Sequence, residues 1–195
     1  MPSPRVSRFF SQVDQAEFAL CRSINRSLRY RPVLTLFKVV SRLGDGWLWY
    51  APILSLPLNS PAEGQAIGEL MTGAGLARTI SYKVLKRWLV RERPFISFPV
   101  IHCGTPPLDR YSFPSGHTLH AVCFTTVLAL TLPALAVLLL PFTLAVAASR
   151  VVLGLHYPSD VLAGALIGGI LGLVATVWGA APLLMMTATQ TGVAG

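Results

Sequence analysis

Uncharged stretches dominate the second half of this sequence. Residues 118–148 contain no aspartate, glutamate, lysine or arginine, and neither do residues 161–195. As one helix, the first stretch would be roughly 46 Å long, whereas the hydrocarbon core of a bilayer is about 30 Å thick. We therefore predict two spanning helices that form a hairpin with its turn near Thr131-Leu132-Pro133. A final span is predicted over about residues 160–180.

The first half of the chain is interrupted more often. Residues 66–90 predict a helix, whose closely spaced glycines allow close packing against a neighbouring helix. Residues 32–58 are apolar but broken by Gly44-Asp45-Gly46, so we predict one tilted or bent span with its break near a membrane interface. A short loop is expected from Asn59 to Gln65. A second loop, over residues 95–113, begins with residues apolar enough to enter the interface.

Residues 1–31 are polar and basic, yet they contain apolar residues at helical intervals. These are Phe10, Val13, Cys21, Ile24 and Leu28. The pattern predicts an amphipathic helix that lies on the membrane surface. A disordered tail is the alternative.

Composition is typical of a membrane protein. Of the 195 residues, 53% are hydrophobic and 12% are charged, whereas soluble domains average about 25% charged residues. The length allows one domain, residues 1–195. We predict an all-α, polytopic membrane bundle of about five to six transmembrane or membrane-embedded helices, plus the N-terminal amphipathic helix.

The net charge of +8 would suit nucleic-acid binding, but the cations lie among membrane segments. We therefore expect a membrane and anionic lipid as partners, and no nucleic acid. The three cysteines are scattered and odd in number, which indicates neither a disulfide framework nor a metal site. Residues 1–30 lack the apolar core of a cleavable signal peptide.

Three reactive side chains lie between the two uncharged stretches: Arg150, His156 and Asp160. Ionisable groups beside spanning segments are rare and usually face a cavity or serve a function. If a helix starts near Pro158, Asp160 lies in its first turn and can accept a hydrogen bond from one imidazole nitrogen, which leaves the other free to react. Arg150 could hold an anion beside that imidazole. By itself, a histidine and an aspartate four residues apart more often form a structural hydrogen bond.

Two other segments strengthen the functional interpretation. Lys86 and Arg93 are two helical turns apart, and Pro94 then ends the helix. Pro114-Ser115-Gly116-His117 opens the next apolar stretch with a hydroxyl, a glycine, a second imidazole and a helix N-terminus, where free N–H groups bind anions. Three cations, a helix start and two histidines together predict a phosphate site with a nucleophile and a proton donor. Both ends of residues 118–148 must then lie on one side of the membrane.

Other polar residues have structural explanations. Arg78 lies in mid-helix and needs a polar partner or water, and His120 is interpreted as a satisfied core histidine. Asp45 could contact the site, although a turn residue between glycines is the simpler interpretation. His102 is taken as a loop histidine, and Arg110 as a headgroup contact or a solvated charge. Contacts with lipid headgroups explain Lys83, Arg87 and Arg91.

Together, Lys86 through Arg93-Pro94, Pro114 through His117 and Ser149-Arg150 through His156 to Asp160 resemble the three-part signature of the type-2 phosphatidic acid phosphatase superfamily. That superfamily also contains vanadium haloperoxidases and bacterial acid phosphatases. The three parts agree with the family in spacing and order. The catalytic core that the resemblance implies spans residues 64–180.

The resemblance implies a role for each matching residue. His156 would be the nucleophile, Asp160 would orient it, and His117 would protonate the leaving group and later activate water. The phosphoryl oxygens would be held by Lys86, Arg93, Ser115, the Gly116 N–H and Arg150. Pro94, Pro114 and Ser149 would support the site. No metal and no cofactor are expected, because the cations supply the electrostatic stabilisation.

The implied activity is hydrolysis of the terminal phosphate of a membrane lipid by a phospho-histidine mechanism. Candidate substrates are undecaprenyl diphosphate, phosphatidylglycerophosphate, phosphatidic acid and lipid A. The alternatives are a soluble-substrate acid phosphatase, a vanadate-dependent haloperoxidase and a non-enzymatic lipid transporter. The spans argue against the first two, because haloperoxidases of the family are typically soluble.

Membrane orientation is the least constrained expectation. The cations of the three motifs would place the site in the cytoplasm by the positive-inside rule. Several of them are required for phosphate binding, however, so they are a biased measure. The resemblance favours a multi-pass protein of the inner membrane with its site on the extracytoplasmic face.

Overall fold

The computed structural model describes residues 4–107 and 109–191, and the side chains of residues 10–107 and 109–179. In chain order its helices are α1 (Pro4–Asn25), the 3-10 helix η1 (Arg26–Arg29), α2 (Arg31–Leu43), α3 (Trp47–Asn59), α4 (Pro61–Trp88), α5 (Pro94–Ser97), α6 (Gly116–Thr131), α7 (Pro133–Val152) and α8 (Pro158–Thr191). The described residues form no strand, only one isolated bridge between Glu92 and Tyr111. The all-α prediction is confirmed.

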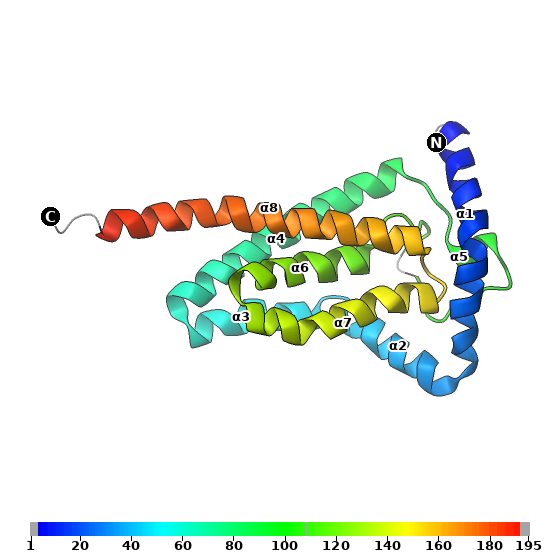
Figure 1. Ribbon diagram of the computed structural model, residues 1–195, viewed down its shortest axis with the longest axis horizontal. Coiled ribbons are helices and arrows are strands. Elements are labelled where there is room, and N and C mark those ends of the chain that lie inside the picture. Colours follow the sequence, from blue (N-terminus) through cyan, green and yellow to red (C-terminus); the bar gives the residue numbers. More distant parts are fainter. Residues whose placement is uncertain (1–3, 108, 192–195) are drawn as a thin grey trace.

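Figure 1 shows α3, α4, α6, α7 and α8 lying alongside one another as an elongated bundle. Helix α1 crosses one end of this bundle, beside α5 and the last turns of α7. The chain passes through this end several times, where α4 stops, α6 begins, α7 stops and α8 begins. The motif residues are all found there, as the hairpin prediction requires.

The predicted hairpin is present. Leu132 separates α6 from α7, and Pro133 is the first residue of α7, where its missing N–H leaves no hydrogen bond unmade. Helix α8 then packs along α6 at very short range. Its glycines make this possible, because a Cβ on Gly164 would lie 2.6 Å from the Ser115 carbonyl oxygen, and one on Gly168 would lie 2.5 Å from the Leu119 carbonyl oxygen.

Two apolar clusters hold the bundle together. The larger one lies between α3, α4, α6 and α7, with Trp49, Met71, Phe124 and Val127 at its centre. The smaller one lies at the end that α1 crosses, where the apolar face of α1 meets Ile101, Val151 and Tyr157. This second cluster lies next to the motif residues, because Val151 and Tyr157 directly follow Arg150 and His156 in the chain.

The first half of the chain differs from the prediction in two respects. The expected loop from Asn59 to Gln65 is wrong: α4 already begins at Pro61, because proline suits the first helical position and Glu63 is favourable in the first turn. Gly44-Asp45-Gly46 does break the segment 32–58, but the two halves are separate helices, α2 and α3. Gly46 makes the turn with φ of 138°, which a residue with a side chain rarely adopts.

Helix α1 is formed, and its apolar face packs against protein. Phe10 and Cys21 are buried, and Phe18 packs on Phe98 with 4.4 Å between the ring centroids. The apolar start of the loop 95–113 therefore turns inward to contact α1. The prediction that these two segments lie against the membrane missed this mutual contact, because each segment covers the other.

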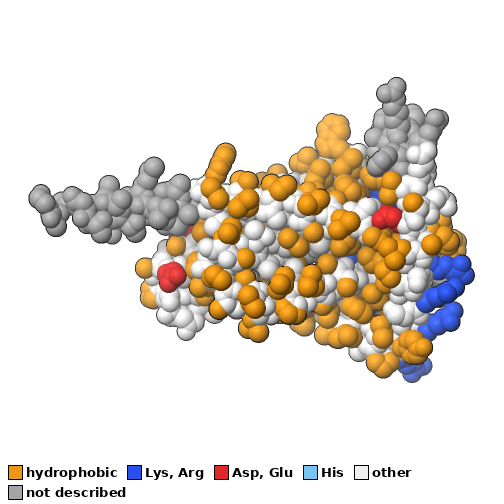
Figure 2. Space-filling view, in the orientation of Figure 1, with side chains coloured by type: hydrophobic (Ala, Val, Ile, Leu, Met, Phe, Trp, Pro, Cys, Tyr) orange, Lys and Arg blue, Asp and Glu red, His pale blue; other side chains and the backbone are white. Residues whose placement is uncertain are grey.

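The outside of the bundle is apolar along its length. Figure 2 shows hydrophobic side chains covering the long face, whereas lysines and arginines gather at the end where α1 lies. Leu138 and Leu144 of α7, and Leu166 and Trp178 of α8, are more than half exposed. Among the described residues, α7 and Pro158–Gly179 are long and apolar enough to cross a bilayer.

We expect Gly168→Ala to weaken the bundle, because the added methyl group meets the backbone of α6 with no flexible side chain to move aside. Overpacking of this kind typically costs about 1–3 kcal/mol. The measurement is thermal unfolding in mild detergent. Gly169→Ala is the matched control, because its Cβ would lie 3.9 Å from the nearest heavy atom, on Val122. Equal melting temperatures for the two variants would contradict the proposed close contact.

Candidate active site

Each motif residue stands at the end of a helix or just beyond it. Lys86 lies in the last turn of α4, and Arg93 immediately precedes α5. His117 lies in the first turn of α6, Arg150 in the last turn of α7, and Asp160 in the first turn of α8. Helix ends bring these side chains to one rim of the bundle, which a long helix interior could not do.

His156 lies in the turn between α7 and α8 and is only 2% exposed. Its Nε2 lies 3.2 Å from Nη1 of Arg93. A guanidinium can only donate, so Nε2 must be the acceptor and the proton of the neutral ring lies on Nδ1. Burial lowers the pKa of His156 well below its ordinary value, and the cations Arg93 and Arg150 lower it further. The ring is therefore neutral, with its lone pair directed toward the cations.

Asp160 lies behind the ring. Its Oδ2 is 3.6 Å from Nδ1 of His156, slightly longer than a hydrogen bond, and Nδ1 has no hydrogen-bond partner in the described part of the chain. The same oxygen accepts a hydrogen bond from the Tyr157 N–H at 2.9 Å. Catalytic hydrogen bonds are often long without substrate and shorten in the complex. The placement fits the predicted orienting role.

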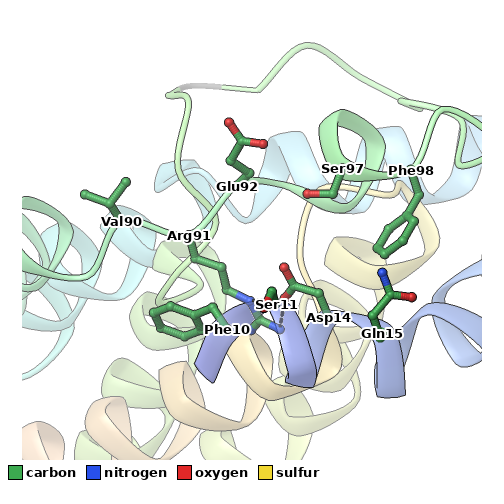
Figure 3. A pocket seen from close by; sticks show the side chains of 9 residues that line it. All are labelled: Phe10, Ser11, Asp14, Gln15, Val90, Arg91, Glu92, Ser97 and Phe98. Atoms are coloured by element: carbon green, nitrogen blue, oxygen red, sulfur yellow. Dashed lines mark hydrogen bonds and ion pairs between the residues drawn. The ribbon is translucent and has the colours of Figure 1, made fainter. Parts of the chain in front are cut away.

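A buried arginine outside the three motifs contacts the other oxygen of Asp160. Arg91 Nη1 donates to Asp160 Oδ1 at 2.5 Å and to the Ser159 hydroxyl at 2.7 Å. The same guanidinium donates to Asp14 and Glu17 of α1, both at 2.8 Å. Figure 3 shows Arg91 reaching from the segment after α4 to Asp14 on α1. The interpretation of Arg91 as a lipid-headgroup contact is wrong, because its side chain is buried.

Lys86 and Arg93 share a carboxylate. Both form ion pairs with Oδ1 of Asp109, in the loop before α6, with Arg93 Nη2 at 2.9 Å. The Tyr82 hydroxyl donates to Oδ2 at 2.6 Å. Burial alone would raise the pKa of Asp109, but the hydrogen bonds from Lys86 and Tyr82 outweigh it and lower the pKa to about 2. An anion is therefore already bound by two of the predicted phosphate ligands.

The start of α6 is held close to α8 and α4. The Ser115 N–H donates to the Asp160 carbonyl at 3.1 Å, and the Ser115 hydroxyl contacts Thr118 at 3.0 Å. A Cβ on Gly116 would lie 2.7 Å from the Tyr82 ring, so a larger residue would displace that ring or the helix. The first turn of α6 therefore lies beside Tyr82, which contacts Asp109.

His117 contacts the turn between α2 and α3. Its Nε2 forms an ion pair with Oδ1 of Asp45, the residue that we interpreted as a simple turn residue. Burial would raise the pKa of Asp45, but its hydrogen bond with His117 lowers the pKa below the ordinary value. The possible contact of Asp45 with the site is therefore real. Burial lowers the pKa of His117 below its ordinary value, and the Asp45 carboxylate opposes this shift because it favours the protonated ring.

Arg150 and His117 line one cavity of about 370 Å³, which α2 closes on its other side. Arg150 is 4% exposed, and its Nη1 donates to the Ser41 hydroxyl at 2.5 Å. Its Nε has no hydrogen-bond partner among the described residues. The cavity therefore has an arginine with unused hydrogen-bonding capacity in its wall.

The three residues predicted to support the site, Pro94, Pro114 and Ser149, lie at or near helix ends. Pro94 is buried at the first position of α5. Pro114 follows a cis peptide bond and precedes Ser115. The Ser149 hydroxyl is buried and donates to the Val146 carbonyl at 2.6 Å within α7, so it does not face the cations.

A family model described as the PAP2 superfamily matches residues 67–182, which is more than half of the chain. The chain belongs to the PAP2 superfamily. This is the type-2 phosphatidic acid phosphatase superfamily that the three motifs resemble. All the motif residues described above lie inside the matched range.

Similar PAP2 proteins act on membrane lipids. The chain is 35% identical over 158 residues to decaprenylphosphoryl-5-phosphoribose phosphatase of Mycolicibacterium smegmatis, covering 79% of this chain and 84% of that protein. It is 29% identical over 165 residues to lipid A 1-phosphatase of Rhizobium johnstonii, covering 75% and 68%. The crystal structure of Aquifex aeolicus LpxE superposes with a TM-score of 0.72 at 26% identity, covering 82% of this chain and 94% of that one.

Two polar side chains inside the bundle, those of His120 and Arg78, each keep a nitrogen without a hydrogen-bond partner among the described residues. His120 is buried against Trp49 and Phe124, as expected of a core histidine, but its Nε2 has no hydrogen-bond partner among the described residues, so "satisfied" was wrong. Arg78 is likewise left with an unpartnered Nε. Both residues line a smaller cavity of about 190 Å³ beside His117. Arg110 pairs with Glu92 at the surface, as a solvated charge would.

Sequence reasoning missed Arg91 and Asp109, which contact motif side chains, and it considered the contact of Asp45 but preferred a turn role for that residue. Arg91 carried a usable signal, because it lies between two motif positions and an arginine two residues before Arg93 cannot share its direction on one helix. Asp45 also had one, since it is the only acidic residue between positions 18 and 62. Asp109 lies in an irregular loop, where spacing predicts no contact. Among the described residues, no group of three histidine, cysteine or carboxylate side chains could hold a metal ion.

We expect Arg91→Leu to lower the free energy of unfolding by about 3–5 kcal/mol, because it leaves three carboxylates without their shared buried cation. Arg110→Leu is the control: its ion pair with Glu92 is exposed, and such pairs contribute at most about 1 kcal/mol. Unfolding of both variants in mild detergent is the measurement. Similar losses for the two variants would mean that the buried network does not stabilise the fold.

Proposed function

We propose that this PAP2 protein is an integral-membrane lipid phosphatase that removes a terminal phosphate through a phospho-histidine on His156. The observation that carries this proposal is the neutral His156 ring, whose Nε2 lone pair faces Arg93 in a site that also holds Lys86 and Arg150. A lone pair directed at cations is suited to attack a phosphoryl group that those cations bind.

In the first step, Nε2 of His156 attacks phosphorus and the bond from phosphorus to the leaving oxygen breaks. Attack leaves a positive charge on the imidazole, which Asp160 stabilises across Nδ1. Lys86, Arg93 and Arg150 balance the charge on the phosphoryl oxygens, and the Ser115 hydroxyl and the Gly116 N–H add hydrogen-bond donors at the start of α6.

His117 donates a proton to the leaving oxygen as that bond breaks. Its contact with Asp45 supports this role, because the carboxylate favours the protonated ring and so opposes burial, which lowers the pKa of His117. In the second step a water molecule attacks the phospho-histidine, and His117 takes a proton from it. Inorganic phosphate leaves and the neutral His156 is restored, so the proton balance closes over one cycle.

Substrate binding must release Asp109 from the cations. Asp109 Oδ1 contacts both Lys86 and Arg93, the two side chains that would hold a phosphoryl oxygen. Asp109 is on a loop and about a third of its side chain is exposed, so it can withdraw without disturbing a helix. In the free enzyme the single carboxylate offsets one of the two positive charges and pairs with both cations.

A lipid substrate is supported by the apolar exterior of the bundle and by the relatives, which are named as phosphatases of decaprenyl-linked sugars and of lipid A. Undecaprenyl diphosphate, phosphatidylglycerophosphate and phosphatidic acid present the same terminal phosphate. We place the protein in the inner membrane as a multi-pass protein with the site on the extracytoplasmic face.

We expect His156→Ala to abolish phosphate release from lipid phosphates while the protein still inserts and melts near the wild-type temperature. Labelled substrate should leave acid-labile phosphate on the wild-type chain and none on the variant. The assay panel includes a water-soluble phosphate ester, so that a general acid phosphatase is recognised by equal rates. A variant that keeps more than a few per cent of the rate would contradict the nucleophile assignment.

Replacing Asp109 should strengthen anion binding. In Asp109→Asn the competing negative charge is gone, so we expect orthovanadate to inhibit at a concentration about tenfold lower, equivalent to about 1.4 kcal/mol. Glu92→Gln is the control, because this carboxylate is half exposed and pairs only with Arg110 in the described part of the chain. Weaker inhibition of Asp109→Asn would mean that Asp109 arranges the cations instead of competing for them.

A further inference from the structure

The cavity between α2 and the site extends beyond the place needed for one phosphoryl group. It measures about 370 Å³, and a water molecule takes up about 30 Å³ of the liquid, so it has room for roughly twelve waters. Arg150 and His117 form its inner wall, while Lys38, Ser41 and Arg42 of α2 form its outer wall. A phosphoryl group bound at Arg150 would leave most of this space empty.

The cavity lies on the His117 side of the site, and this position indicates which part of the substrate would fill it. His117 is the proton donor to the leaving oxygen in the proposed mechanism, and it faces this cavity. His156, from which the attack comes, does not line it. In an in-line displacement the leaving group departs on the side opposite the nucleophile. The cavity therefore receives the part of the substrate that remains attached to the leaving oxygen.

The outer wall of the cavity carries two positive charges that could bind an anion, those of Lys38 and Arg42. Lys38 and Arg42 are four residues apart on α2, and thus on one face of that helix. Among the described residues neither forms an ion pair. Asp45, the only carboxylate in the cavity wall, is already paired with His117. The cavity therefore has an excess of positive charge beyond what one phosphoryl group requires.

Helix α2 is attached to the catalytic centre through a buried contact. The Ser41 hydroxyl, between Lys38 and Arg42, accepts a hydrogen bond from Arg150. The helix lies outside residues 67–182, which the PAP2 family model matches. The catalytic chemistry therefore comes from the family's shared region, whereas the second set of cations comes from a part of the chain that the family does not define.

We propose that Lys38 and Arg42 form a second anion subsite, and that the substrate class is a lipid whose leaving group carries a phosphate of its own. This inference rests on the proposed lipid phosphatase function. A lipid diphosphate places that second phosphate directly on the leaving oxygen. The terminal phosphate binds Lys86, Arg93 and Arg150, and the inner phosphate binds Lys38 and Arg42. After transfer, His117 has protonated the inner phosphate, which departs with the lipid.

The test compares a lipid diphosphate with the monophosphate of the same lipid tail, in neutral detergent at fixed ionic strength. The variant is Lys38→Gln with Arg42→Gln. We expect its kcat/KM for the diphosphate to fall about tenfold further than its kcat/KM for the monophosphate. The matched control is Lys83→Gln with Arg87→Gln, which removes two exposed cations of α4 that do not line the cavity. Its two rates should change equally.

A binding measurement separates this inference from the proposed reaction. Calorimetry with inorganic pyrophosphate and orthophosphate should give tighter pyrophosphate binding in the wild type, and the difference should disappear in the Lys38/Arg42 variant. Equal losses on both lipids, or equal binding of the two anions by the wild type, would overturn the subsite and mean that Lys38 and Arg42 serve only as surface charges. Failure of the wild type to hydrolyse any lipid phosphate would overturn the proposed function itself.

Discussion

The structure depends on burying three arginines at one end of a helical bundle. Arg91, Arg93 and Arg150 are each less than 5% exposed. A buried charge is tolerated only with a partner and well-formed hydrogen bonds. Arg91 forms ion pairs with three carboxylates. Arg93 pairs with the Asp109 carboxylate and donates to the Leu155 and Asp109 carbonyls. Arg150 donates to the Ser41 hydroxyl. The best-compensated cation, Arg91, does not line the cavity beside α2, whereas the least compensated one, Arg150, does.

This gradient has a functional meaning. A cation saturated with carboxylates has nothing left to offer a ligand, so Arg91 acts on the protein and holds Asp160. A cation with an unpartnered nitrogen, such as Arg150, retains attraction for an arriving anion. Arg93 and Lys86 are intermediate, because both pair with the single carboxylate of Asp109, which lies on a loop. The same residue type therefore performs three tasks, which its neighbours determine.

Sequence predicted the parts of this structure that depend on local pattern. The hairpin followed from the length of an uncharged stretch, and the break at Gly44-Asp45-Gly46 followed from glycine. The motif residues were found by spacing, and the structure brings His156, Asp160 and Arg93 together. The counter-charges were not predicted, because Asp14 and Arg91 are 77 residues apart in the sequence. No helical period links such positions, so only the folded chain reveals the pairing.

The same limit explains why the contact between two predicted membrane-surface segments was missed. An apolar stripe on α1 and an apolar start to the loop 95–113 each predict contact with a membrane when examined alone. In the fold, Phe18 and Phe98 cover one another. An amphipathic pattern predicts that the apolar face of a helix is covered, but it does not indicate whether lipid or protein covers that face.

The link between α1 and the start of α8 constrains the order in which the protein can be assembled. Glu17 leaves the ribosome 142 residues before Ser159, which together with Asp160 completes the network of α1. Until α8 has begun, the acidic face of α1 lacks these partners. Arg91 and Phe98 can hold α1 before then, but Asp160 joins the network only when α8 enters the bundle. The carboxylate beside His156 is therefore the last of the motif side chains to be put in place.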